Sequence, residues 1–203
     1  MRTLKCIQLN CHKSKAAVAN LRNELMCDID VGLIQEPHTY DNDVKGLAGF
    51  QVLHAGDADH RPRAAIIAKQ HVNIWFDRRF SDADTVVGIV KYGDKQIFIA
   101  SVYLDIQLNA VISNSMERLV SYCKMNNLEL ILGVDSNAHS VLYGDETNPR
   151  GEILEEFITV NGLEVSNMGR APTFVARGTS TVIDVTLTLH THCLLYTSDA
   201  ADE

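Results

Sequence analysis

The segment Leu128–Val134 constrains the fold most, because it is apolar almost throughout and polar residues follow it at once. A run of this kind predicts a central β-strand that is buried on both faces of its sheet. Apolar strands and helical patterns alternate along the rest of the chain, which is typical of a layered α/β domain. We find no internal repeat, linker or low-complexity stretch.

Hydrophobic periodicity predicts the other elements. Helices are expected at Ser14–Met26, with Ser14 as the N-cap, at Val111–Lys124 and at Gly151–Val160. Many neighbouring strands connect too tightly for a purely parallel sheet, and Gly93-Asp94 is a hairpin signal. We therefore expect two mixed sheets packed together with helices outside. Further strands are expected at Leu4–Leu9, Val31–Gln35, Ala64–Ala68, Thr85–Tyr92, Gln96–Tyr103 and Ser180–Leu187.

Composition narrows the class of protein. The 203 residues are 46% apolar, which suits one globular domain and excludes a disordered chain or a coiled coil. The five cysteines form no CxxC pair, which argues against a disulfide scaffold or zinc ribbon and favours a reducing, intracellular compartment. No apolar run approaches the roughly 20 residues of a membrane span, and the N-terminus is no secretory signal. The net charge of −8 argues against nucleic-acid binding by bulk electrostatics, but it allows an enzyme that meets phosphate through a metal ion.

The last eleven residues, 193–203, differ from the rest because they carry three acids and no base. They resemble the translation of a transposon-end adapter used in DNA sequencing libraries. We expect residues 1–192 to form the domain, the tail 193–203 to be foreign, and the natural protein to continue past about His192. A natural acidic terminus is the alternative.

Polar residues follow three apolar strands. Asn10 ends the first, Glu36 follows Val31–Gln35, and Asp135 and Asn137 follow the central strand. The carboxyl ends of strands are where α/β folds commonly place ligands, and a hard ion such as Mg²⁺ prefers carboxylate and amide oxygens. Each residue singly could be a turn former or a solvated strand end. The set of three strand ends favours one shared metal site.

Asp184 is unusual because apolar residues flank it within a predicted strand. A buried carboxylate costs several kcal/mol unless it is paired or hydrogen-bonded. We therefore expect a partner, commonly a histidine whose ring the carboxylate orients. The alternative places Asp184 on the exposed face of an alternating strand.

These residues carry a family resemblance. The chain resembles the endonuclease/exonuclease/phosphatase superfamily and, within it, the apurinic-like endonuclease domain of non-LTR retrotransposons, over essentially all of residues 1–189. The segments that carry the resemblance stand in the correct order at sensible spacing: Ile7-Gln8-Leu9-Asn10, Leu33-Ile34-Gln35-Glu36-Pro37, Ser101-Val102-Tyr103, Gly133-Val134-Asp135-Ser136-Asn137-Ala138-His139 and Ser180-Thr181-Val182-Ile183-Asp184. Weaker support comes from Arg61-Pro62-Arg63-Ala64-Ala65, Asn148-Pro149-Arg150-Gly151 and Ala171-Pro172-Thr173-Phe174.

The resemblance implies a DNase I-like α/β fold, a four-layer sandwich of two mixed β-sheets flanked by helices, and a DNA endonuclease that uses Mg²⁺, or alternatively Mn²⁺. It implies that the product is a 3′-hydroxyl that primes a reverse-transcriptase domain on the same polypeptide, in the nucleus. The resemblance implies that Glu36 is the principal metal ligand, that Asn10 assists it and that Tyr103 contacts the scissile phosphate. It implies that Asp135 aligns or deprotonates the attacking water, that Asn137 helps to hold the phosphate or that water, that Asp184 orients a catalytic histidine, and that His139 supports the active-site loop or the phosphate. Apart from the resemblance, we expect Arg61, Arg63 and Lys69 to contact the DNA backbone, and the alternative places each of them on the exposed surface without such a contact.

One departure limits the resemblance. The family expects a Ser-Asp-His segment beyond Asp184, and the sequence contains none. We therefore expect the 203-residue chain to be nearly inactive. A cellular apurinic-type endonuclease or phosphatase of the same superfamily, or an inactive degenerate retroelement copy, are the alternatives.

Overall fold

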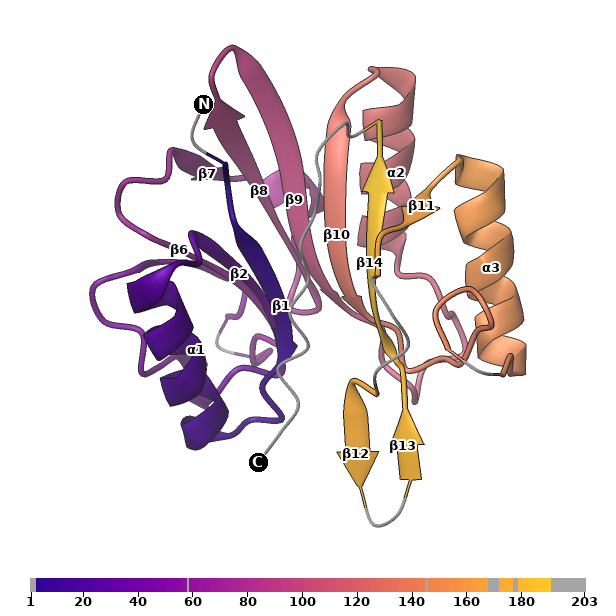
Figure 1. Ribbon diagram of the computed structural model, residues 1–203, viewed down its shortest axis with the longest axis horizontal. Helices are drawn as coiled ribbons and strands as arrows, with labels where there is room; N and C mark the ends of the chain where they lie inside the picture. The colour runs from indigo at the N-terminus through magenta and orange to yellow at the C-terminus, as the bar shows by residue number, and fades with distance from the viewer. Residues whose placement is uncertain (1–2, 58, 145, 168–171, 177–178, 191–203) are drawn as a thin grey trace.

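Two mixed β-sheets organise the chain. The computed structural model describes residues 3–57, 59–144, 146–167, 172–176 and 179–190 (Figure 1). The first sheet pairs its first two strands in parallel and the others antiparallel. Its strands, in spatial order, are β1 (Cys6–Asn10), β2 (Val31–Gln35), β6 (Ala64–Ala68) and β5 (Gln51–Leu53).

The second sheet has six strands, and only its β10–β9 pair is parallel. In spatial order they are β11 (Glu164–Val165), β14 (Asp184–Leu189), β10 (Glu129–Asp135), β9 (Lys95–Tyr103), β8 (Thr85–Tyr92) and β7 (Ile74–Phe76). The predicted hairpin joins β8 to β9, where Gly93 adopts a φ of +61°. Shorter elements are the ribbons β3 (Thr39–Tyr40) with β4 (Asp43–Val44) and β12 (Phe174–Ala176) with β13 (Thr179–Thr181), and the 3₁₀ turn η1 (Arg78–Phe80).

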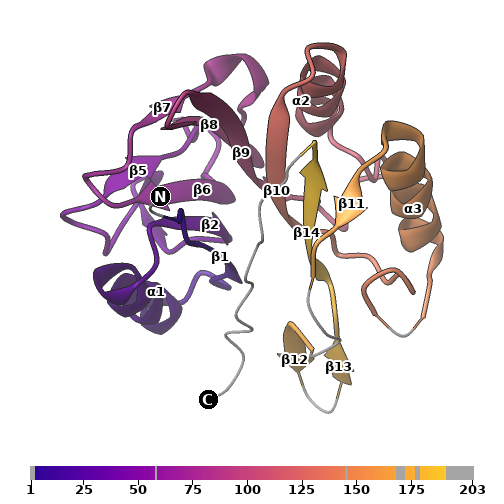
Figure 2. The same cartoon turned by 45° about the horizontal axis from the view of Figure 1, so that its top comes forward.

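Helices cover the outer face of each sheet (Figures 1 and 2). Helix α1 (Lys15–Cys27) packs on the first sheet, whereas α2 (Asn114–Met125) and α3 (Pro149–Asn161) pack on the second. The predicted N-cap of α1 is confirmed, because the Ser14 hydroxyl accepts a hydrogen bond from the Ala17 N–H. The four-layer sandwich expected from the sequence is therefore the observed fold.

The layer between the two sheets is apolar at one end and polar at the other. At the apolar end, Leu33 and Ile66 of the first sheet pack against Ile99 and Ile131 of the second. At the polar end, the Gln35 amide donates to Ser101 Oγ at 2.9 Å and to the Gly133 carbonyl at 3.0 Å. Thr186 Oγ1 likewise donates to Gln8 Oε1 at 2.9 Å. Because buried polar groups need partners, these bonds fix how the sheets face each other.

The predicted strand Ser180–Leu187 is wrong as a single element. The chain forms β13, leaves the strand conformation at Val182 and Ile183, and starts β14 at Asp184. The Ile183 carbonyl accepts bonds from the Ser136 N–H and hydroxyl, while Thr173 Oγ1 accepts the Ile183 and Asp184 N–H groups. These contacts to distant segments interrupt the strand, so Asp184 lies at its start rather than in its middle.

Three further observations concern membrane-spanning helices, the cysteines and the C-terminal segment. No helix in the described ranges is long and apolar enough to cross a membrane. Among the described residues, Cys6, Cys11, Cys27 and Cys123 form no disulfide with one another. The segment 193–203, predicted to be foreign, lies outside the described residues.

Helix α3 meets the loop after β10 so closely that only glycine fits at position 151. A Cβ atom on Gly151 would lie 1.7 Å from the His139 carbonyl oxygen. We expect Gly151→Ala to lower the free energy of unfolding by about 3 kcal/mol, although alanine is ordinarily the better helix former by about 1 kcal/mol. Urea denaturation measures this loss, with exposed Glu152→Ala as the control. Equal stability of the Gly151 variant and the parent would show that the contact relaxes freely.

Candidate functional site

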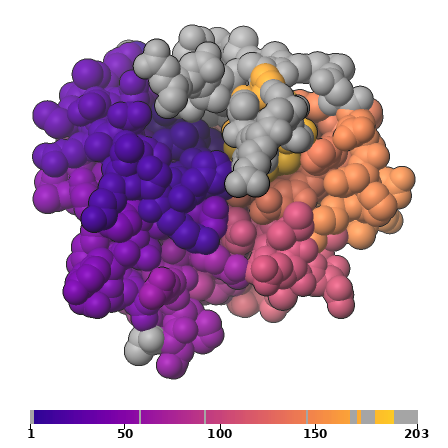
Figure 3. All heavy atoms as spheres, turned by 90° about the horizontal axis from the view of Figure 1, so that it is seen from below, coloured from indigo at the N-terminus to yellow at the C-terminus, as the bar shows by residue number. Residues whose placement is uncertain are grey.

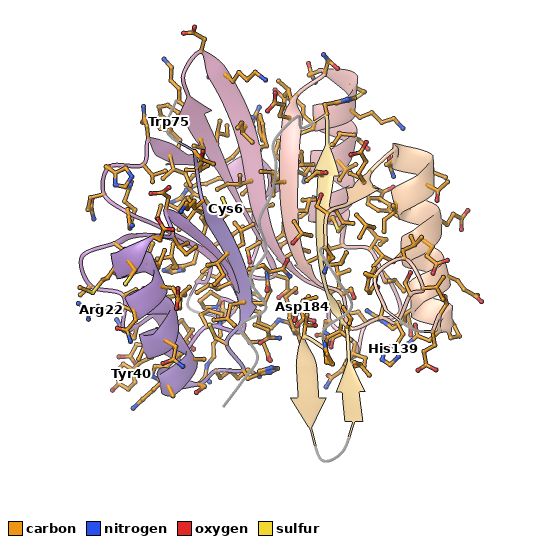
Figure 4. The ribbon with its side chains drawn as sticks, in the orientation of Figure 1. Cys6, Arg22, Tyr40, Trp75, His139 and Asp184 are labelled. Atoms are coloured by element: carbon orange, nitrogen blue, oxygen red, sulfur yellow. The ribbon has the colours of Figure 1, made fainter. Side chains whose placement is uncertain are left out.

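The polar ends of five strands meet at one end of the sandwich. Asn10 of β1 is in register with Gln35 of β2, and Glu36 follows directly. In the second sheet, Asp135 of β10 lies between Tyr103 of β9 and Asp184 of β14. These ends lie at the bottom of Figure 1, and Figure 4 labels Asp184 there, between the sheets.

One hydrogen bond joins the two sheets at this point. Asn10 Nδ2 donates to Asp135 Oδ2 at 2.6 Å, and Asn10 Oδ1 accepts the His12 N–H at 2.8 Å. The main-chain N–H of Asn137 also bonds the Asp135 carboxylate, whereas the Asn137 side chain donates to the Leu104 carbonyl at 3.1 Å. Three of the predicted site residues are therefore in direct contact. From below, Figure 3 shows the N-terminal part of the chain in indigo on one side and the residues near position 150 in orange on the other.

Burial and mutual repulsion dominate the electrostatics of the site. Burial, together with the charge of Glu36, raises the pKa of Asp135 to about 6, although bonds from Asn137 and Asn10 oppose the shift. Burial and the neighbouring Asp135 raise the pKa of Asp184 to about 8. Burial and the charges of Glu36 and Asp135 raise the pKa of Tyr103 to about 12. The negative charges of Glu36 and Asp135 therefore act on the ionisable groups around them.

Glu36 has an unusual backbone conformation. Its φ is +44°, a left-handed value that costs roughly 1–3 kcal/mol for a residue with a side chain. Its N–H donates to the Arg63 carbonyl at 2.8 Å, and its carbonyl accepts the Lys13 N–H at 2.7 Å. Lys13 Nζ also lies 2.8 Å from Glu36 Oε1. Because both its N–H and its carbonyl are bonded, the backbone of Glu36 is held in this conformation despite the strain.

The site has donor atoms that suit a hard cation. Asp135 Oδ1 and Asp184 Oδ1 are buried without a hydrogen-bond partner, so the site holds two oxygen atoms whose bonding capacity is unused. Within the described part of the chain, no three His, Cys, Asp or Glu side chains are grouped closely enough to hold a metal by themselves. Mg²⁺ commonly takes one or two carboxylates and keeps several waters. The Glu36 carboxylate and Asn10 Oδ1 fit that pattern, and their role as ligands stays a prediction.

The remaining predicted residues lie apart from this contact. His139 Nδ1 pairs with Glu146 Oε1 at 3.1 Å, and Figure 4 places His139 beside α3, away from Asp184. The His139 carbonyl accepts the Asn148 N–H at 3.1 Å, which ties the loop to the start of α3. Arg61 is exposed, whereas Arg63 forms ion pairs with Asp84 and Asp105. Contact of these residues with DNA stays a prediction.

Sequence reasoning missed four polar residues that hold the site together. Gln8, Gln35 and Ser101 bridge the two sheets, and Thr173 bonds Asp184. The sequence held one weak signal for two of these residues, Gln8 and Gln35. A glutamine within an apolar strand has to find a buried partner, and both glutamines stand in such strands.

Comparison with known proteins identifies the family of this chain. The protein family described as endonuclease-reverse transcriptase matches residues 97–200, just over half of the chain. The chain belongs to this family. The endonuclease domain of TRAS1, a telomere-specific non-LTR retrotransposon, has a similar structure with a TM-score of 0.78 and 27% identity, over 91% of this chain and 84% of that domain. The predicted relation to retrotransposon endonuclease domains is therefore confirmed.

More distant structures share the fold alone. The catalytic domain of Xenopus laevis APE2 has a TM-score of 0.60 and 14% identity, over 91% of this chain and 82% of that one. A 3′-5′ exonuclease from Neisseria meningitidis has a TM-score of 0.59 and 16% identity, over 90% and 86%. No curated protein matches the chain by sequence. These two proteins therefore share the sandwich fold with this chain.

Proposed function

We propose that this domain is a divalent-metal-dependent DNA endonuclease that nicks target DNA and leaves a 3′-hydroxyl. A reverse-transcriptase domain of the same polypeptide would extend that end in the nucleus. The observation that carries the proposal is the Asn10–Asp135 bond between the sheets, with an unpartnered Asp135 oxygen beside the charge of Glu36. The similarity to a retrotransposon endonuclease domain supports it.

The residues divide the reaction between them. Glu36 and Asn10 would hold Mg²⁺ or Mn²⁺, which when bound polarises a phosphoryl oxygen and neutralises developing charge. Asp135 orients the attacking water and accepts its proton, a role that suits a carboxylate whose pKa is raised to about 6. Water forms a new P–O bond and gives a proton to Asp135, while the bond to the 3′ oxygen breaks and that oxygen takes a proton from solvent, so the products are a 3′-hydroxyl and a 5′-phosphate.

Tyr103 and Asp184 would have supporting roles in the reaction. The Tyr103 hydroxyl keeps its proton at neutral pH, because its pKa is raised to about 12, so it can donate to a phosphate oxygen. Asp184 would orient an imidazole, and its unpartnered Oδ1 is the atom available for that contact. Because the sequence holds no Ser-Asp-His segment, we expect the 203-residue chain to nick slowly.

Nicking of supercoiled plasmid tests the proposal, because one cut per molecule is scored and slow rates remain measurable. We expect nicked circles with Mg²⁺ and none with excess EDTA, and we expect the new ends to be extended by a DNA polymerase. Glu36→Gln should slow nicking about 100-fold through weaker metal binding, whereas exposed Glu156→Gln on α3 should leave the rate unchanged. Nicking that survives EDTA, or ends that no polymerase extends, would contradict the proposal.

A further inference from the structure

The Arg63 guanidinium lies over the Tyr103 ring at the edge of the site. Its Cζ atom is 5.0 Å from the centre of the Tyr103 ring, within the range of a cation–π contact. Nε and Nη2 donate to the two oxygens of Asp84, and Nη1 donates to Asp105 Oδ2, each at 2.5 Å. Carboxylates on two loops therefore hold the guanidinium in its place over the ring.

The main chain of Arg63 forms a hydrogen bond that connects it to Glu36. The Arg63 carbonyl accepts the Glu36 N–H at 2.8 Å, and the Arg63 N–H donates to Ala83 at 2.7 Å. The Asp84 carbonyl accepts the Tyr103 N–H at 2.8 Å. One residue thus contacts the strained Glu36 through its backbone and Tyr103 through its side chain. Asp84 links the two residues directly, because its carboxylate binds the Arg63 side chain and its carbonyl accepts the Tyr103 N–H.

We propose that Arg63 is a positioning residue, which holds Tyr103 and Glu36 in their working geometry through its fixed guanidinium and its main chain. The proposal rests on the proposed function, since that function gives Tyr103 and Glu36 their roles. Only arginine meets both demands on the side chain, because its flat fork can bond a carboxylate with two nitrogens while one face stacks on an aromatic ring.

The local charges favour positioning over direct contact with DNA. Arg63 faces two carboxylates, and Arg150 stands beside them, donating to the Asp105 carbonyl at 3.2 Å and the Leu108 carbonyl at 3.1 Å. Arg63 helps to hold the pKa of Asp105 below its usual range, although the Gln107 N–H is the larger cause. A DNA phosphate would have to compete with both acids for nitrogens that are already bonded.

Arg63→Lys separates the two roles, because lysine keeps the charge but loses the fork and the flat face. Positioning predicts that kcat for nicking falls about 10-fold while KM changes less than about 2-fold. The salt dependence of DNA binding should stay as in the parent.

The matched control is Arg118→Lys on α2. Arg118 is exposed, its Cζ atom lies 5.7 Å from the centre of the Phe80 ring, and nicking by this variant should be unchanged. A raised KM with unchanged kcat, and a salt slope smaller by about one, would overturn positioning in favour of a phosphate contact.

A second measurement is independent of catalysis. In ¹⁵N-labelled protein, the Arg63 Nε–H signal should be shifted upfield by the Tyr103 ring and should exchange slowly, because Asp84 accepts that proton. Tyr103→Leu should remove the upfield shift and retain the slow exchange. A signal at the solvent-exposed position with fast exchange would refute the proposal even if the protein nicks DNA. Nicking that survives excess EDTA, with this signal intact, would instead refute the proposed function.

Discussion

Asp135→Asn is expected to reduce the nicking rate about 1000-fold, the range of a lost general base, while the protein stays folded. Asparagine keeps the size of the side chain and can still accept the bond from Asn10 Nδ2. It cannot accept a proton from water. Because Asp135 is almost fully buried and its pKa is raised by burial, removal of its charge should also leave the protein at least as stable.

The pH dependence of nicking checks the same role. Asp135 acts as a base only when ionised, so the rate of the parent protein should rise with pH through about 6 and then level off. The residual rate of Asp135→Asn should lack this rise. Asp57→Asn, at a fully exposed acid, should behave like the parent. An Asp135→Asn protein that nicks at the parental rate, or that keeps the rise near pH 6, would remove Asp135 from the mechanism.

Two of the three strands that sequence patterns predicted best, β2 and β6, are buried along their whole length. Val31–Gln35, Ala64–Ala68 and Thr85–Tyr92 agree with β2, β6 and β8 to the residue. Apolar runs of this kind depend little on their surroundings, because any position in the centre of a sandwich buries them. The same reasoning explains why the layered architecture followed from the sequence.

The short elements could not be predicted, because long-range pairing creates them. Strands β3 and β4 have two residues each, too few for any alternation to show. The break before Asp184 depends on the bond from Ser136 to the Ile183 carbonyl, which spans 47 residues, and on the bond from the Asp184 N–H to Thr173. A local pattern of apolar residues therefore merged β13 and β14 into one strand.

The site shows the same division between local and distant information. That Asn10, Glu36 and Asp135 end apolar strands was visible in the sequence, since each polar residue follows an apolar run. Their meeting was not visible, because the Asn10–Asp135 bond spans 125 residues and depends on how two sheets face each other. The acids that hold Arg63, at positions 84 and 105, were equally invisible, so the sequence suggested a surface contact for that arginine.

Asp184→Asn is expected to stabilise the protein, and the gain should grow with pH. The pKa of Asp184 is raised to about 8 in the fold, first by burial and then by Asp135, whereas an unfolded aspartate titrates near 3.9. Between these values the folded state holds a proton that the unfolded state has released, so stability falls as pH rises. Above about pH 8 the folded protein carries the full cost of an ionised, buried carboxylate, which asparagine avoids.

Thermal or urea unfolding in EDTA isolates this effect, because all other titrating groups are common to both proteins. The difference in unfolding free energy should be near zero at about pH 4 and reach roughly 2–4 kcal/mol at about pH 8.5, less than the full shift because asparagine also needs partners. In an Asp135→Asn background the gain should shrink, since one cause of the raised pKa is then absent. A gain that is constant with pH would mean that asparagine merely packs better. A stability loss at every pH would mean that Asp184 has a positively charged partner, and that the acid is retained for stability rather than for catalysis.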